Sequence, residues 1–200
     1  MEWKEKQYAG CRFQDVDWQE EEISGIVFED CRFYGAVLSG LITRNCQFIN
    51  CDFSFSRLDG STHIRSGFLN CQFNGASLFG ASFEECKATG SSFSGATITG
   101  LTISGGNFSF TVWQGCCLKK MDLHGCSFEN ADLSEADLEK TDLSGCDLRH
   151  AVVVGANLRD SDLRGARIEG VDLKSARMKN TRIDLEQAVL LAESLGAKLS

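Results

Sequence analysis

A large apolar residue recurs at every fifth position of this chain, without a slip in register. Of the 37 positions from Trp3 to Ile183, 34 are Phe, Leu, Ile, Val, Met, Trp or Tyr, and only Thr43, His63 and Ala88 differ. A period of five fits neither an α-helix, with 3.6 residues per turn, nor a β-strand, with a period of two. The period therefore predicts a solenoid, in which the repeated outer surface rather than a pocket carries function.

The other positions of the five-residue unit are also patterned around this apolar residue, which we call the centre. Two residues before the centre the side chain is usually small, and the residue just before it is often Asp, as in the units that begin at Ala131, Ala136 and Thr141. Seventeen of the 20 Gly residues lie two residues after a centre. Because Gly tolerates positive φ, the pattern predicts one turn per unit. We expect the small residue and the centre to face inward and the other three to face solvent.

Units such as Ala-Asp-Leu-Ser-Glu at 131–135 and Ala-Asn-Leu-Arg-Asp at 156–160 resemble the A(D/N)LXX unit of pentapeptide-repeat proteins. The resemblance covers about residues 3–183 and implies an all-β fold, a right-handed quadrilateral β-helix with four units per coil. The 37 centres would then make about nine coils. With about 4.8 Å between coils, the rod would be roughly 40 Å long. We expect residues 1–183 to form this β-helix and residues 184–200 to form a C-terminal helix and tail.

The composition narrows the function classes. The 200-residue chain has a net charge of -8 and an isoelectric point of about 4.9, which disfavours plain nucleic-acid binding, because phosphate contacts need Lys and Arg. An acidic surface favours basic partners, although the charge could equally serve only solubility. The sequence has neither an apolar signal-peptide core nor a membrane-spanning run, so we expect a cytoplasmic protein.

The ten Cys residues invite a metal or disulfide interpretation, which the register argues against. Nine of them occupy the small inward site, where Ala and Ser stand in other units, and Cys117 alone does not. We therefore expect buried, reduced thiols and neither a metal site nor a cofactor. Cys11, Cys31, Cys51 and Cys71 are 20 residues apart and would stack in one column, at a separation that disulfide geometry allows.

Three unusual centres predict local irregularities. Thr43 and His63 are 20 residues apart and should lie on the same face of adjacent coils, where we expect a bulged or hydrated ladder. A His at a centre is more often a hydrogen-bonded core residue than a catalyst. Trp113 is the bulkiest interior centre and should widen its coil.

The repeat stops at Ile183, and the next residues read as a helix. Asp184 would be the N-cap and Gln187 would complete a capping box. One helical face, predicted to cover the last coil, carries Leu185, Ala188, Val189, Ala192 and Leu195. Leu190 and Leu191 extend the apolar surface, which favours a lid that also dimerises. This tail resembles the C-terminal segment of the gyrase-protecting MfpA and Qnr families, and the resemblance implies a homodimer joined end to end.

The unbroken register is more similar to MfpA than to the loop-bearing Qnr proteins. That resemblance implies a DNA mimic that binds DNA gyrase and protects it from topoisomerase poisons, as antibiotic resistance or self-immunity. The predicted partner-binding residues are an outward column of Asp122, Asp142 and Asp162, with Asp132 and Asp172 on another face. These Asp side chains could instead satisfy backbone groups of the turns. A rod that binds another, unidentified protein is the alternative, and no set of residues suggests an enzyme.

Overall fold

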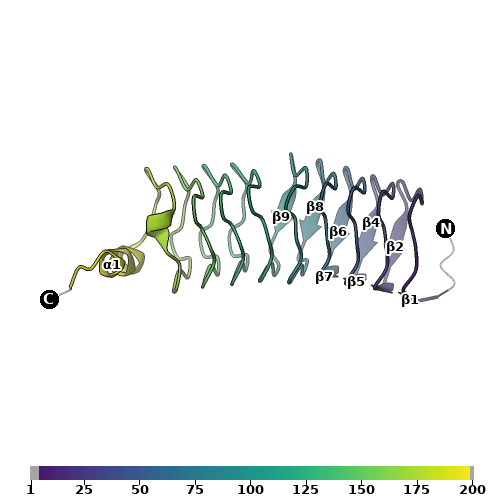
Figure 1. Ribbon diagram of the computed structural model, residues 1–200, viewed down its shortest axis with the longest axis horizontal. Coiled ribbons are helices and arrows are strands. Elements are labelled where there is room, and N and C mark those ends of the chain that lie inside the picture. Colours follow the sequence, from purple (N-terminus) through teal and green to yellow (C-terminus); the bar gives the residue numbers. More distant parts are fainter. Residues whose placement is uncertain (1–4, 199–200) are drawn as a thin grey trace.

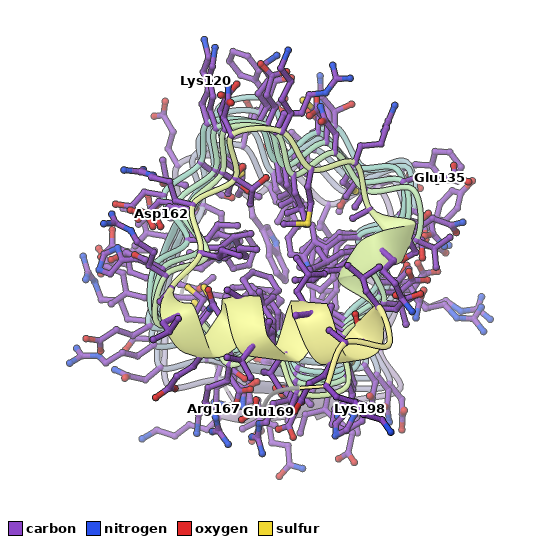
Figure 2. All side chains as sticks on the ribbon, turned by 90° about the vertical axis from the view of Figure 1, so that its left-hand side faces the viewer. Lys120, Glu135, Asp162, Arg167, Glu169 and Lys198 are labelled. Atoms are coloured by element: carbon purple, nitrogen blue, oxygen red, sulfur yellow. The ribbon has the colours of Figure 1, made fainter. Side chains whose placement is uncertain are left out.

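The computed structural model describes residues 5–198, which wind into a rod of stacked turns with the first and last of these residues at opposite ends of the rod (Figure 1). Seen along its axis, the rod has four sides, with the large side chains gathered inside and the charged ones outside (Figure 2). The predicted all-β solenoid with one short C-terminal helix is therefore confirmed. No helix among the described residues is both long enough and apolar enough to span a membrane.

Within residues 5–198, nine short strands form two parallel sheets on two sides of the rod. The first sheet has the order β1-β3-β5-β7 and the second the order β2-β4-β6-β8-β9. In each pair of strands, the residues that lie opposite each other are 20 apart in the sequence, as Tyr8 and Phe28 are. The strands are β1 (Gln7–Ala9), β2 (Glu22–Ser24), β3 (Val27–Glu29), β4 (Ile42–Arg44), β5 (Gln47–Ile49), β6 (Thr62–Ile64), β7 (Gly67–Leu69), β8 (Ser82–Glu84) and β9 (Thr102–Ser104).

Regular strands extend through only part of the rod. β2 to β9 span five turns, fewer than the nine coils expected from the repeat count. Beyond them the same 20-residue spacing continues through isolated bridges, the last of which joins Asp162 to Arg182. Regular strands are short because each side of a coil has only five residues, and the turn at the corner uses two of them.

Stacked aromatic rings fill the N-terminal half of the interior. Four successive stacking contacts join Phe33, Phe53, Phe73, Phe93 and Trp113, with ring centroids 4.7, 5.1, 4.8 and 4.0 Å apart. Burying one such side chain contributes roughly 1.5–3 kcal/mol, and each ring pair adds about 0.5–1.5 kcal/mol. On the side of the rod that carries Trp113, the bridges continue from Ser92 through Val112 to Asp132. The prediction that Trp113 widens its coil is therefore wrong.

The last residue of each unit from Gly10 to Gly170 turns the corner with positive φ, whereas Ser175 ends a short 3-10 turn at Leu173–Ser175. Gly100 has φ of 73° and Asn50 of 53°, as expected for residue types that tolerate the left-handed region. Phe55 and Phe110 occupy the same position with φ of 59° and 60°, which is unusual for bulky side chains.

Thr43 and His63 interrupt the apolar column without disturbing the backbone. β4 and β6 pair in regular register, with Thr43 opposite His63, so the predicted bulge is wrong. The hydroxyl of Thr43 lies 2.8 Å from Nδ1 of His63, and the hydroxyl of Ser61 lies 3.0 Å from Nε2. Both ring nitrogens are therefore satisfied inside the fully buried core.

Burial lowers the pKa of His63 to about 3, from an ordinary value of 6.5. Below pH 6.5 the unfolded chain binds a proton at this residue that the folded chain excludes. The free energy of unfolding should therefore fall by about 1.4 kcal/mol per pH unit as the pH drops below 6.5 towards 3. Above pH 6.5 this residue has no further effect.

We predict that His63→Phe, which keeps an aromatic ring in the column, removes this part of the pH dependence. Urea unfolding at pH 7 and pH 5 should show the native chain losing about 2 kcal/mol more stability than the variant. Equal losses in both proteins would show that His63 is protonated inside the fold.

Candidate interaction surfaces

The Asp residues just before the centres all make the same hydrogen bond to the backbone of the following turn. One carboxylate oxygen of each accepts a hydrogen bond from the backbone N–H two residues later, as Asp132 does from Ser134 and Asp142 from Ser144, both at 2.9 Å. This bond satisfies a turn donor that faces solvent. The local role that the sequence left open is thus present, and it leaves the second carboxylate oxygen for other partners.

The carboxylate of Asp162 is covered by neighbouring side chains, so it is not the exposed member of the acidic ladder that the sequence predicted. Its side chain is 5% exposed and forms ion pairs with Arg164 at 2.7 Å and Arg182 at 3.1 Å. The hydrogen bond from Arg164 is the main cause that lowers the pKa of Asp162 to about 2. Asp162 stands in column with Asp142 and Asp122, yet its charge is covered at this end of the column.

The rest of this column is more accessible. Asp122 accepts a 2.7 Å hydrogen bond from Nδ1 of His124, and both side chains are about 70% exposed. That hydrogen bond lowers the pKa of Asp122 and raises the pKa of His124. Asp142 is half-buried. The predicted three-residue ladder is therefore reduced to two carboxylates.

A second side of the rod carries acidic residues without paired cations, and we call Asp132, Glu135 and Asp172 the Asp132 face. Figure 2 places Glu135 at a corner well away from Asp162. Among residues 5–198, none of the ion pairs includes a residue of the Asp132 face. Lys174 is only two residues after Asp172 in the sequence, but its ammonium group donates to the carbonyl of Ser194 in α1.

Helix α1 (Leu185–Ser194) crosses the end of the rod beside Arg167 and Glu169 (Figure 2). The predicted capping box is present, since Asp184 accepts from the N–H of Gln187 and the Gln187 side chain accepts from the N–H of Asp184. The amide nitrogen of Gln187 also donates to the carbonyls of Leu163 and Ala166. A polar side chain thus anchors the cover on the last coil.

The apolar side chains of the tail divide into two groups. Leu191 packs against the core, and Val189 is half-buried. Leu185, Leu190 and Leu195 are 81%, 39% and 67% exposed. Leu185 and Leu195 therefore do not belong to the covering face, contrary to the helical pattern, and they leave an apolar end surface open.

An exposed aromatic pair on the N-terminal half escaped the sequence analysis. Tyr34 and Phe55 are 46% and 60% exposed, with ring centroids 5.3 Å apart. The Phe55 ring lies where a side chain on Gly75 would stand. The signal that could have found the pair is a Phe at the corner position, where Gly and Asn are usual.

The cysteines follow the register. All ten are free, eight are buried, Cys11 is half-buried and Cys117 is exposed. Burial raises the pKa of Cys86 and Cys126 to about 11 and that of Cys146 to about 12. These thiols are protonated and unreactive at neutral pH, in keeping with their role as small inward residues.

Comparison with known proteins identifies the repeat. The sequence matches the pentapeptide repeats family, in eight copies, over residues 26–62, 76–109, 107–145 and 141–180. No curated protein matches the sequence significantly.

Two solved structures of QnrB1, described as a plasmid-mediated fluoroquinolone resistance protein, share the fold. The trypsin-treated R167E form has 24% identity and a TM-score of 0.73, covering 97% of each chain. The full-length form has 24% identity and a TM-score of 0.69, covering 96% of this chain and all of QnrB1.

We predict that the Asp residues of the column differ in their contribution to folding. Asp162→Asn keeps the turn hydrogen bond but removes a covered charge from two guanidinium groups, and should cost about 1–2 kcal/mol. Asp122→Asn, in an exposed pair, should change stability by no more than about 0.5 kcal/mol. Urea unfolding of both variants checks this, and equal effects would contradict the difference in burial.

Proposed function

This chain belongs to the pentapeptide repeat family, and on that premise we propose that it binds DNA gyrase in place of DNA and protects the enzyme from topoisomerase poisons. The observation that carries the proposal is the match of nearly the whole rod, α1 included, to the fold of QnrB1. A net charge of -8 agrees with a surface that faces a DNA-binding channel.

The Asp132 face is the side of the rod that best suits this role. Its carboxylates are free of ion pairs among the described residues, whereas Asp162 and Asp147 are covered by arginines. Coils stacked about 4.8 Å apart carry charge less densely than DNA, which has one charge per about 1.7 Å. The mimicry therefore rests on a few uncompensated acids, with Asp122 and Asp142 contributing from the other side.

The alternative is a rod that binds a different protein. It is favoured by the arginines that neutralise the C-terminal end of the Asp162 column, and by the exposed Tyr34 and Phe55 pair. In this case gyrase activity would be indifferent to the protein, with or without a poison.

We predict that the purified protein lowers the yield of fluoroquinolone-stabilised cleavage complexes of gyrase, and inhibits supercoiling at higher dose. The triple variant Asp132→Asn, Glu135→Gln, Asp172→Asn should need about ten times the dose, the equivalent of losing roughly 1.4 kcal/mol of binding. A matched control removes three acids from other sides of the N-terminal half by Asp17→Asn, Glu20→Gln and Asp30→Asn.

The control should keep most of the activity of the native chain. No change in cleavage or supercoiling at any dose would refute the proposal and leave the alternative. Equal losses in the triple variant and its control would assign the effect to net charge rather than to the Asp132 face.

We also propose that two chains join through the C-terminal end, because Leu185 and Leu195 expose apolar surface beside the half-buried face of α1. Light scattering after size exclusion should give twice the chain mass of 21.9 kDa. Leu185→Lys with Leu195→Lys should give the monomer mass. Phe79→Lys, at a side chain that is 57% exposed on the middle of the rod, is the control and should leave the dimer intact.

A further inference from the structure

The ladder between coils is broken on two adjacent sides of the rod, between residues 95–105 and 115–125. In most of the rod a centre donates its N–H to the carbonyl 19 residues later, as Leu78 does to Thr97 at 2.8 Å and Leu118 to Asp137 at 2.9 Å. Within the described chain, no such bond is present for Ile98 or Ile103. Figure 1 shows a wider step after the turn that carries β9.

The bonds in the opposite direction are missing across the same step. The bridges run from Ser77 to Thr97 and from Cys117 to Asp137, but none in the described part of the chain joins Thr97 to Cys117. β9 pairs with β8 alone among the described strands. On the other two sides the ladder is intact, through Asn107 and Val112. The rod is thus hinged open along one edge and continuous along the opposite one.

A cavity of about 710 Å³ occupies this opening, within the usual range for ligand sites. One wall is formed by residues 95–103, and the other includes Cys117, Lys119, Lys120 and Asp122. Lys119 is paired with Glu139 at 2.7 Å and Asp122 with His124 at 2.7 Å. Lys120 forms no ion pair within residues 5–198, so it is the cation left for an acidic ligand. Ile98 and Ile103 are each 6% exposed, whereas Leu118 and Leu123 in the next coil are 0% and 1% exposed. The opening therefore reaches the edge of the apolar interior.

Two oversized side chains account for the opening. Leu101 and Met121 occupy the small inward site of consecutive coils, in a column where Ser61, Ala81 and Thr141 stand in other coils. Leu41 stands in the same column, but small Ser61 follows it, and there the N–H of Thr62 still donates to the carbonyl of Leu41 at 2.9 Å. Both line the cavity. They lie at the corner between the two open sides, so their bulk holds the coils apart there.

We propose that this cleft binds an extended, acidic segment of a partner protein, which inserts as an additional strand between the two coils. Both walls present unpaired backbone N–H and C=O groups in the register of a parallel ladder, and an extended backbone is the ligand that satisfies both. Apolar side chains five residues apart would contact Ile98 and Ile103. An acidic side chain would face Lys120.

A probe peptide follows from the repeat itself. Residues 136–145 form the rung that runs along the same two sides of the rod, and the acetylated and amidated peptide of that sequence carries acids and two Leu residues five apart. Cys117 is the exposed thiol among the described cysteines and lies in the wall, so its rate of maleimide labelling reports occupancy. Saturating peptide should slow the labelling at least fivefold, and a scrambled peptide should not.

The variant Leu101→Ala with Met121→Ala tests the cause of the opening. With small residues restored, the two coils should close, and the peptide should no longer change the labelling rate of Cys117. Peptide protection that persists in this variant, or no protection in the native chain, would overturn the proposal. Protection that arises without peptide and grows with protein concentration would assign the cleft to a second copy of this chain and would also overturn it.

A disulfide trap measures the opening independently of any ligand. Thr97→Cys places a thiol across the step from Cys117, and the two can join only if the Cα atoms come within about 7 Å. The control, Ser77→Cys with Thr97→Cys and Cys117→Ser, puts the same pair on coils that are bridged. Under mild oxidation the control should form its disulfide at least ten times faster. Equal rates would show a closed rod in solution and refute the proposal, without bearing on gyrase binding.

Discussion

Backbone hydrogen bonds between residues about 20 apart hold this rod together, and every other feature must be compatible with them. Each bond requires neighbouring coils to lie about 4.8 Å apart, so side chains in one column must have similar thickness. The column from Phe33 to Phe93 meets this condition with parallel rings 4.7–5.1 Å apart. The column that contains Leu101 and Met121 does not, and there the bonds are lost. Two large residues in succession at the small inward site, rather than a single one such as Leu41, therefore mark the place where the solenoid is interrupted.

The same ladder limits what the outward charges are free to do. An Asp before a centre is first a turn acceptor, so its presence in a column is no sign of a binding surface. What distinguishes Asp132 from Asp162 is the second carboxylate oxygen, which two arginines occupy in Asp162. Arginines 2 and 20 residues later in the sequence are sufficient to cancel a charge at this spacing. The partner-binding argument thus depends on ion pairs between coils rather than on counts of acids.

The sequence predicted the solenoid, the inward cysteines and the capping box because each depends on a local or strictly periodic rule. It failed where the outcome depends on a neighbour 20 residues away. The hydrogen bonds between Thr43 and His63 replace the expected bulge, since each side chain supplies the partner that the other lacks. The burial of Asp162 depends on Arg182, and the exposure of Leu185 and Leu195 depends on where Gln187 anchors α1. The break beside Leu101 could have been found by searching each column for two large residues in succession at the small inward site, as Leu101 and Met121 are.

At the end of the rod and at the cleft in its middle, backbone carbonyls lack a donor from the next coil. The two places differ in whether another group supplies that donor. In a regular coil the carbonyl of the small inward residue accepts an N–H from 21 residues later, as Ala156 accepts from Arg177 at 2.8 Å. At the end of the rod Ala166 receives instead the side-chain amide of Gln187, which stands at that same spacing. In the cleft the carbonyls of Ala96 and Leu101 receive no such donor from the described chain. The cleft is therefore a rod end without a cover. The kind of group that α1 satisfies at the end stays open in the cleft, and the inserted backbone that we propose would satisfy it there.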